Sequence, residues 1–328
     1  MILKKSGIDI EKITVPFRDF KRSDIASDLC HAKLIAFGEN PHAVAEYYSF
    51  YIDAIQYLLN QEKKVLILLE YPYWHNYYLD DFIEGHNEKF LEYAFFDGET
   101  SALYGTGLKQ FYSRVQALYK LYPKKIACRH IDAIMSPLGQ ERIQIVESLD
   151  KAKWEVNRTI KEYQKKNEPE KWSELREQFM FNEAMESHQQ LKPDVMVVIT
   201  GSFHARKKGG HPLSDKYMQS LTALISERLN IVPLSILITI LEGQYAKLEY
   251  RDNKLEKIAV NCSEWGQEDT QMAYKNTTRN LSGDIFMTKL NDFAEKMDNP
   301  EDLYYDWISN HDYIVALRNG SADLSVKI

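Results

Sequence analysis

"LIAFGENPH" (residues 34–42) is an apolar run that ends in glycine and continues to His42. A second stretch, "VVITGSFHARKKGG" (197–210), has the same order, with glycine followed by His204. Short continuous apolar runs are typical of parallel strands that helices cover on both faces, and glycine lets the chain turn sharply where a strand ends. The two stretches therefore predict two parallel strands that present histidines at one edge of a sheet.

Further apolar runs complete this sheet. The strand candidates are residues 32–38, 64–70, 124–132, 194–201, 232–240 and 312–317. Between the first two, apolar and aromatic residues recur at helical spacing, so residues 32–70 read as a βαβ unit. The predicted fold class is α/β, with a central, largely parallel β-sheet flanked by helices.

The rest of the chain reads as helices and one hairpin. Residues 139–190 predict a long, charge-rich helical pair, longer than a crossover needs, which we expect to form an inserted helical lobe beside the sheet. Residues 242–285 contain a hairpin pattern followed by polar loop. We expect a single α/β domain over residues 1–328.

Composition limits the class of protein. The 328 residues are 44% hydrophobic and 27% charged, which is ordinary for a globular protein, and the net charge is −7. This charge argues against a nucleic-acid partner, because phosphate binding needs clustered Lys and Arg. Three widely spaced cysteines, no signal peptide and no apolar run of membrane length predict a cytoplasmic protein with no membrane partner.

Polar side chains follow the predicted strands, and in open α/β sheets functional groups gather at these carboxyl ends. Strand by strand they are Glu39 and His42; Glu70; Arg129 and Asp132; His204 and Arg206. Asn40-Pro41 is a helix-start signal, so we expect His42 in the first helical turn. Two imidazoles and two carboxylates at one edge can act as general base, general acid and orienting groups, or as ligands to a metal.

The order of these motifs resembles a superfamily that includes the erythromycin esterases, the haem-uptake ChaN proteins and the Tiki (TraB) proteins. Gly38-Glu39-Asn40-Pro41-His42 is similar to the Gly-Glu-x-x-His motif of the erythromycin esterases. Gly201-Ser202-Phe203-His204 resembles the second Gly-x-x-His motif, and Glu70 follows the second strand as in these families. "REQFM" (176–180) resembles their Arg-acid-x-x-Met helix, and Ile131-Asp132 resembles an esterase strand, although Arg129-His130 departs from it.

The resemblance implies a hydrolase that adds water to an ester, lactone or amide carbonyl of a small-molecule or peptide substrate. His42 would take the proton of the water, and Glu70 would orient that imidazole. His204 would protonate the leaving group or bind the oxyanion, Arg176 would stabilise negative charge, and Glu39 would set the tautomer of a histidine. The role of Asp132 stays open.

The substrate cleft is expected to have an aromatic wall and a basic part. Tyr73 and Trp74, from the loop "YPYWHNYY", would form the wall, and Arg129 and Arg206 would bind substrate, Arg206 within an "ARKKGG" segment suited to an anionic portion.

Three alternatives use the same residues. His42, Glu70 and His204 could hold a divalent metal, zinc or manganese, with water at an open position. A haem- or ligand-binding protein of the ChaN kind would use the many tyrosines and histidines as ligands. A toxin or effector domain, or a biosynthetic enzyme, could use the same edge on another substrate.

Overall fold

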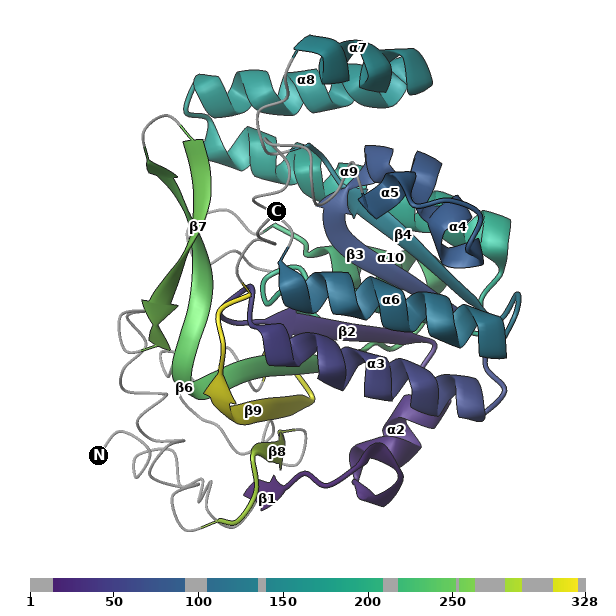
Figure 1. The fold of residues 1–328 in the computed structure, drawn as a ribbon, viewed down its shortest axis with the longest axis vertical. Coiled ribbons are helices and arrows are strands. Elements are labelled where there is room, and N and C mark those ends of the chain that lie inside the picture. The colour runs from purple at the N-terminus through teal and green to yellow at the C-terminus, as the bar shows by residue number, and fades with distance from the viewer. Residues whose placement is uncertain are drawn as a thin grey trace.

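The structure of the protein is a computed structural model that describes residues 14–91, 105–134, 140–208, 218–251, 254–262, 281–290 and 309–323. Its sheet runs in the order β1-β8-β9-β6-β2-β5-β3-β4, and β7 pairs with β6 (Figure 1). The strands are β1 (Thr14–Pro16), β2 (Leu34–Glu39), β3 (Val65–Pro72), β4 (Ile126–Asp132), β5 (Val195–Gly201), β6 (Leu234–Arg251), β7 (Lys254–Asn261), β8 (Ile285–Lys289) and β9 (Tyr313–Gly320).

Helices cover both faces of this sheet. They are α2 (Ile25–His31), α3 (Ala45–Asn60), α4 (Asn76–Glu84), α5 (Lys89–Leu91), α6 (Thr106–Leu121), α7 (Gln140–Leu149), α8 (Lys151–Lys165), α9 (Pro169–Leu191) and α10 (Leu221–Leu229), with short 3-10 turns η2 (Phe20–Arg22) and η3 (Tyr73–His75). From β9 to β4 neighbouring strands run parallel, while β1, β7 and β8 pair antiparallel. The predicted α/β class, with a largely parallel sheet and a helical lobe, is confirmed.

Strand alternation sorts the core into two layers. Phe37 and Ile199 face the layer of α3 and α6, drawn in front of the sheet in Figure 1. Ala36 and Val198 face the opposite layer, where they pack with residues of α9 and α10. Because successive side chains of a strand point to opposite faces, the last residues of each strand are divided between these layers as well.

The ends of β2 and β5 lie level with each other. Gly38 pairs with Thr200, and Glu39 pairs with Gly201. The expected strands over 32–38, 64–70 and 194–201 thus form the centre of the sheet, in the order β2, β5, β3. This register brings the polar residues that follow the three strands to one edge.

The helical lobe contains three helices instead of the expected pair. The first predicted helix is divided at Asp150, whose side chain accepts a hydrogen bond from the Lys153 backbone N–H at 3.0 Å. An aspartate that caps in this way starts a new helix, so α8 is separate from α7. After α8, Pro169 occupies the first turn of α9, a position that proline favours.

His42 does not lie in a helix, and the expectation that it occupies a first helical turn is wrong. Helix α3 begins at Ala45, after a loop in which Ala43 has a φ of 56°. The Ala43 carbonyl accepts hydrogen bonds from the backbone N–H groups of Ala246 (3.1 Å) and Asp323 (3.0 Å). This loop is therefore held by strand β6 and by the segment after β9.

Strand β6 is longer than the expected 232–240. It continues to Arg251 and pairs with β7 across Arg251 and Lys254. In Figure 1 this extension leaves the sheet and rises with β7 on the left. The extension carries Tyr245, Ala246 and Lys247 to the loop that contains His42.

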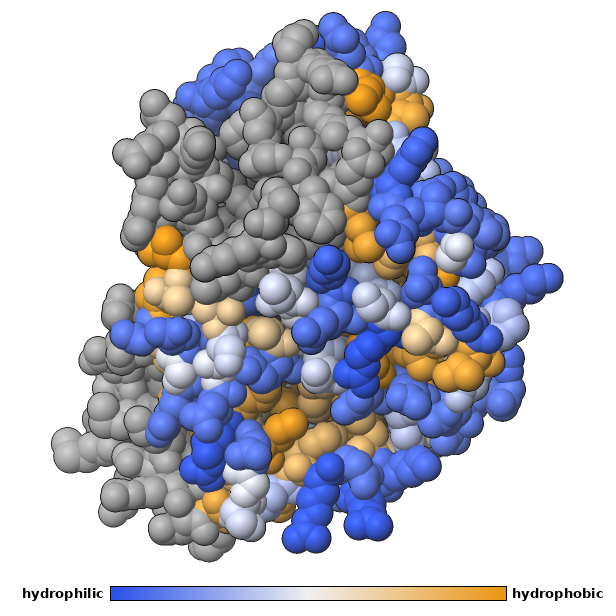
Figure 2. Space-filling view, viewed as in Figure 1, coloured by the Kyte–Doolittle hydropathy of each residue, from blue (hydrophilic) through white to orange (hydrophobic). Residues whose placement is uncertain are grey.

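The surface drawn in Figure 2 is mostly hydrophilic where the chain is described, with apolar side chains in small separate groups. Among the described helices, none combines the length and apolar character needed to cross a bilayer.

Candidate functional site

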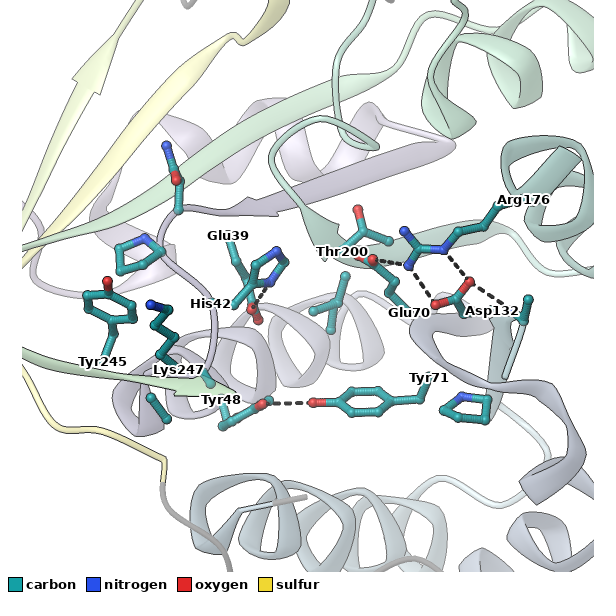
Figure 3. Close-up of a pocket in the computed structure, with 17 residues that line it drawn as sticks. Glu39, His42, Tyr48, Glu70, Tyr71, Asp132, Arg176, Thr200, Tyr245 and Lys247 are labelled. Carbon is teal, nitrogen blue, oxygen red and sulfur yellow. Dashed lines mark hydrogen bonds and ion pairs between the residues drawn. The ribbon is translucent and has the colours of Figure 1, made fainter. Parts of the chain in front are cut away.

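A cavity of about 560 Å³ opens at the carboxyl ends of β2, β5 and β3. Two groups of side chains face each other across it in Figure 3, Glu39 with His42 on one side and Glu70 with Arg176 and Asp132 on the other. Its polar and aromatic lining consists of Glu39, Asn40, His42, Tyr48, Glu70, Tyr71, Asp132, Arg176, Thr200, Tyr245 and Lys247.

Glu39 fixes the tautomer of His42. A carboxylate can only accept, so the 3.2 Å bond between His42 Nδ1 and Glu39 Oε2 places a proton on Nδ1. The other oxygen of Glu39 accepts from the Tyr51 hydroxyl at 3.0 Å. In the neutral imidazole Nε2 is then the lone-pair nitrogen, and it accepts no hydrogen bond from the described residues.

The imidazole of His42 opens into the cavity, with 61% of its side chain exposed. Enclosure by the cavity walls lowers the pKa of His42, but the hydrogen bond to Glu39 and the charge of Glu70 raise it more, so its pKa lies above the usual 6.5. At a given pH a larger share of the His42 ring is therefore protonated than in an ordinary histidine.

Glycine at position 201 makes room for this ring. A methyl group on Gly201 would lie 2.7 Å from His42 Cε1 and 2.8 Å from His42 Nε2, closer than real contacts allow. The same methyl would lie 3.6 Å from Glu70 Oε2. The side chains of His42 and Glu70 thus both lie next to Gly201.

Glu70 uses both of its oxygens. Oε2 accepts the backbone N–H of Gly201 at 2.7 Å. Oε1 contacts Arg176 Nη2 at 2.6 Å and His204 Nε2 at 3.3 Å. Burial raises the pKa of Glu70, but the charges of His204 and Arg176 lower it by more. Its pKa therefore lies well below the usual range, and the group stays ionised.

Arg176 joins Glu70 to Asp132. Its Nε and Nη2 donate to the two oxygens of Asp132 at 2.8 and 2.6 Å, a bidentate pair. Burial lowers the pKa of Arg176, but Asp132 and Glu70 raise it more, so the guanidinium stays charged. For Asp132, burial raises the pKa more than Arg176 lowers it.

His204 lies behind this group and does not line the cavity. Its Nδ1 contacts Glu177, and its Nε2 contacts Glu70. Burial lowers the pKa of His204, but Glu177 and Glu70 raise it to about 10. The ring is therefore an imidazolium between two carboxylates.

The four residues predicted to bind substrate lie outside the cavity lining. Arg129 contacts Asp80 of α4 and donates to the Cys128 carbonyl at 2.9 Å. Arg206 is buried. Tyr73 and Trp74 are buried in an apolar cluster beneath the helical lobe.

The aromatic residues that line the cavity are different ones. Tyr71, two positions after Leu69 and thus on the same strand face, lines the cavity instead of Tyr73. The signal in the sequence is that Tyr71 directly follows the predicted strand 64–70, whereas Tyr73 has the same parity but comes after Pro72, in the turn η3. For Tyr245 and Lys247 the sequence offers no such signal, because they reach the cavity only through the extension of β6.

The residues proposed as metal ligands do not fit a metal in this arrangement. Both nitrogens of His204 face carboxylates, and the Arg176 guanidinium already contacts Glu70. In the part of the chain that is described, no three His, Cys, Asp or Glu side chains are grouped to hold an ion.

A haem fits no better. Three carboxylates, Glu39, Glu70 and Asp132, line the cavity where an apolar macrocycle and its anionic propionates would lie.

Neither a family model nor a curated protein sequence matches the chain. Solved structures share its fold. A histidine-to-asparagine mutant of erythromycin esterase in its open conformation has a TM-score of 0.67 at 12% identity, over 96% of this chain and all of that one. A Bacillus cereus protein has a TM-score of 0.65 at 12% identity over the full length of both chains. A succinoglycan biosynthesis protein has a TM-score of 0.64 at 14% identity over 97% of each.

These similarities extend over nearly the whole chain and show a common fold. The fold of an erythromycin esterase was the expectation from the Gly-Glu-x-x-His motif, and to that extent the resemblance is confirmed.

Proposed function

We propose that the protein is a hydrolase of the erythromycin-esterase kind, which adds water to an ester or lactone carbonyl with His42 as the general base. The observation that carries the proposal is the tautomer of His42. Glu39 holds the proton on Nδ1, so that Nε2 offers a lone pair to the cavity. The fold shared with erythromycin esterase supports the same class of reaction.

The reaction needs only water, the substrate and His42. Water attacks the carbonyl carbon, its proton passes to His42 Nε2, and the carbonyl π electrons move to oxygen. When this oxyanion collapses, the bond to the leaving oxygen breaks, and the imidazolium returns its proton to that oxygen. The products are an acid and an alcohol, and His42 is regenerated.

Glu70 acts in this proposal as a positioning residue. Its oxygens already contact the Gly201 N–H, Arg176 and His204, and its low pKa makes it a weak base for water. Its bond to the Gly201 N–H fixes the backbone on which the His42 ring rests. Arg176 and His204 in turn hold Glu70. They therefore affect the reaction only by fixing the position of His42.

Hydrolysis of 4-nitrophenyl acetate, followed by release of 4-nitrophenolate, tests the proposal. His42→Ala should lower kcat/KM at least about 100-fold, the usual contribution of a general base. His31→Ala is the matched control, because His31 is an exposed residue of α2 bonded to the Ser27 carbonyl. Turnover that survives in His42→Ala would overturn the proposal.

A further inference from the structure

A pair of tyrosine hydroxyls lies in the cavity beside His42. Tyr48 of α3 and Tyr71 of β3 both line it, and their oxygens are 3.1 Å apart (Figure 3). Hydrolysis creates negative charge on the carbonyl oxygen, and a hydrolase needs a donor aimed at that charge. Both nitrogens of His204 contact carboxylates and His204 does not line the cavity, while the Nε and Nη2 of Arg176 already donate to Asp132 and Glu70.

We propose that the Tyr48 hydroxyl, polarised by Tyr71, donates the hydrogen bond that stabilises the developing oxyanion. This inference rests on the proposed function and assigns a catalytic contact within the same cavity. Either hydroxyl can be the donor in the 3.1 Å bond between them. In the proposed arrangement Tyr71 donates to the Tyr48 oxygen, and Tyr48 donates its own proton to the substrate. A hydroxyl that accepts a hydrogen bond is a stronger donor, because the two bonds polarise each other.

The ring of Tyr48 is held in place before any substrate binds. It packs between Tyr51 and Phe111, at ring-centre distances of 6.2 and 5.9 Å. A methyl group on Gly107 of α6 would lie 3.1 Å from Tyr48 Cδ2, so the start of α6 also presses on the ring. A donor fixed in this way pays little to reorganise during the reaction.

Both hydroxyls keep their protons over the working pH range. Burial raises the pKa of Tyr48 well above its usual value, and burial with the charge of Glu39 does the same for Tyr71. The pair therefore acts by donating hydrogen bonds and not by ionising.

Tyr48→Phe tests the inference with 4-nitrophenyl acetate as the probe. We expect kcat to fall about 100-fold, as for loss of one oxyanion donor, while KM changes little. Tyr47→Phe is the matched control. It makes the same change at the next position of α3, where the buried hydroxyl has no partner in the described ranges and does not line the cavity. Equal kcat in the two variants overturns the inference.

Binding of 4-nitrophenyl methylphosphonate, a tetrahedral anion, measured by calorimetry, gives a second readout that needs no turnover. Tyr48→Phe should bind it about tenfold more weakly than Tyr47→Phe, which is the loss of one hydrogen bond to a charged oxygen. Equal binding by the two variants, or no binding by the unmodified protein, counts against the tyrosine donor. Failure of the proposed function is recognised by a different result, because hydrolysis would then survive in His42→Ala.

Discussion

The imidazole of His42 packs against the backbone of Gly201, where a Cβ atom would lie 2.7 Å from the ring. These residues are more than 150 positions apart in the sequence, and the pairing of β2 with β5 brings them together. The glycine of one Gly…His motif thus makes the place for the histidine of the other.

Gly201→Ala should move His42 without unfolding the protein. The added methyl meets the edge of a ring that is free to shift toward the cavity, so the fold is retained. A displaced base costs on the order of 100-fold in kcat/KM on 4-nitrophenyl acetate. Ser202→Ala, the neighbouring position, should react like the unmodified protein. An unchanged rate in Gly201→Ala would show that the position of His42 does not matter.

The pH dependence of hydrolysis should follow His42. Only its neutral form accepts a proton, so the rate should rise with pH through a pKa above 6.5. Glu39→Gln removes the carboxylate whose hydrogen bond and charge help to raise this pKa, so the rise should move to lower pH. The His42 resonance in an NMR titration measures the pKa directly.

Tyr51→Phe is the comparison for this shift. It removes the hydroxyl bonded to Glu39 Oε1 and leaves the carboxylate charge, so the rise should stay at or above its original pH. A shift to lower pH in both variants would mean that Glu39 does not act through its charge.

The part of the fold that the sequence predicts is the part buried on both faces. The runs over 32–38, 64–70 and 194–201 match β2, β3 and β5 within two residues at each end, because continuous apolar residues fit a strand covered by two helical layers. The loop before α3 is not predicted in this way. Asn40-Pro41 has the form of a helix start, but the Ala43 carbonyl bonds Ala246 and Asp323, and the helix begins later.

For the site, the sequence locates residues at strand ends but not their partners. It places Glu39, Glu70 and His204 at one edge, and this is where they lie. Glu39 bonds His42, while Glu70 bonds Arg176 and the Gly201 N–H, and this agrees with alternation: Glu39 shares the strand face of Phe37, whereas Glu70 lies on the face opposite to that of Leu69. Contacts made by β6 and by the segment after β9 have no periodic pattern to reveal them.

His204 should make stability fall at alkaline pH. Its pKa is about 10 in the folded protein and 6.5 is its ordinary value, so its contribution is complete below 6.5 and is lost as pH rises through about 10. In urea titrations from pH 6 to 10.5, His204→Gln should show lower stability at pH 6 and a smaller decline. Parallel curves for the two proteins would contradict an imidazolium at this position.

Arg176→Met should destabilise the protein strongly. It leaves the buried Asp132 and Glu70 carboxylates without the guanidinium between them, a loss of about 3–5 kcal/mol for a broken buried ion pair. Arg114→Met breaks a surface pair with Asp53 and should cost less than about 1 kcal/mol. Urea denaturation compares the two, and similar losses would show that burial of the first pair carries no weight.

Asp323 ties the His42 loop to helix α6. Its buried carboxylate accepts the backbone N–H groups of Gly107 (2.7 Å) and Leu108 (3.4 Å) in the first turn of α6. Its own N–H donates to the Ala43 carbonyl, next to His42. Asp323→Ala should cost about 1–2 kcal/mol, as for loss of a helix cap.

The Asp323→Ala variant should also loosen the His42 loop, seen as faster hydrogen exchange at the Ala45 amide, which donates to the Ser321 carbonyl. Asp323→Asn keeps a side-chain oxygen that can cap α6, so it should retain more of both stability and hydrolysis. If Asp323→Ala lost stability with unchanged exchange at Ala45 and an unchanged rate, the cap would support α6 alone, and the His42 loop would depend on its bond to β6.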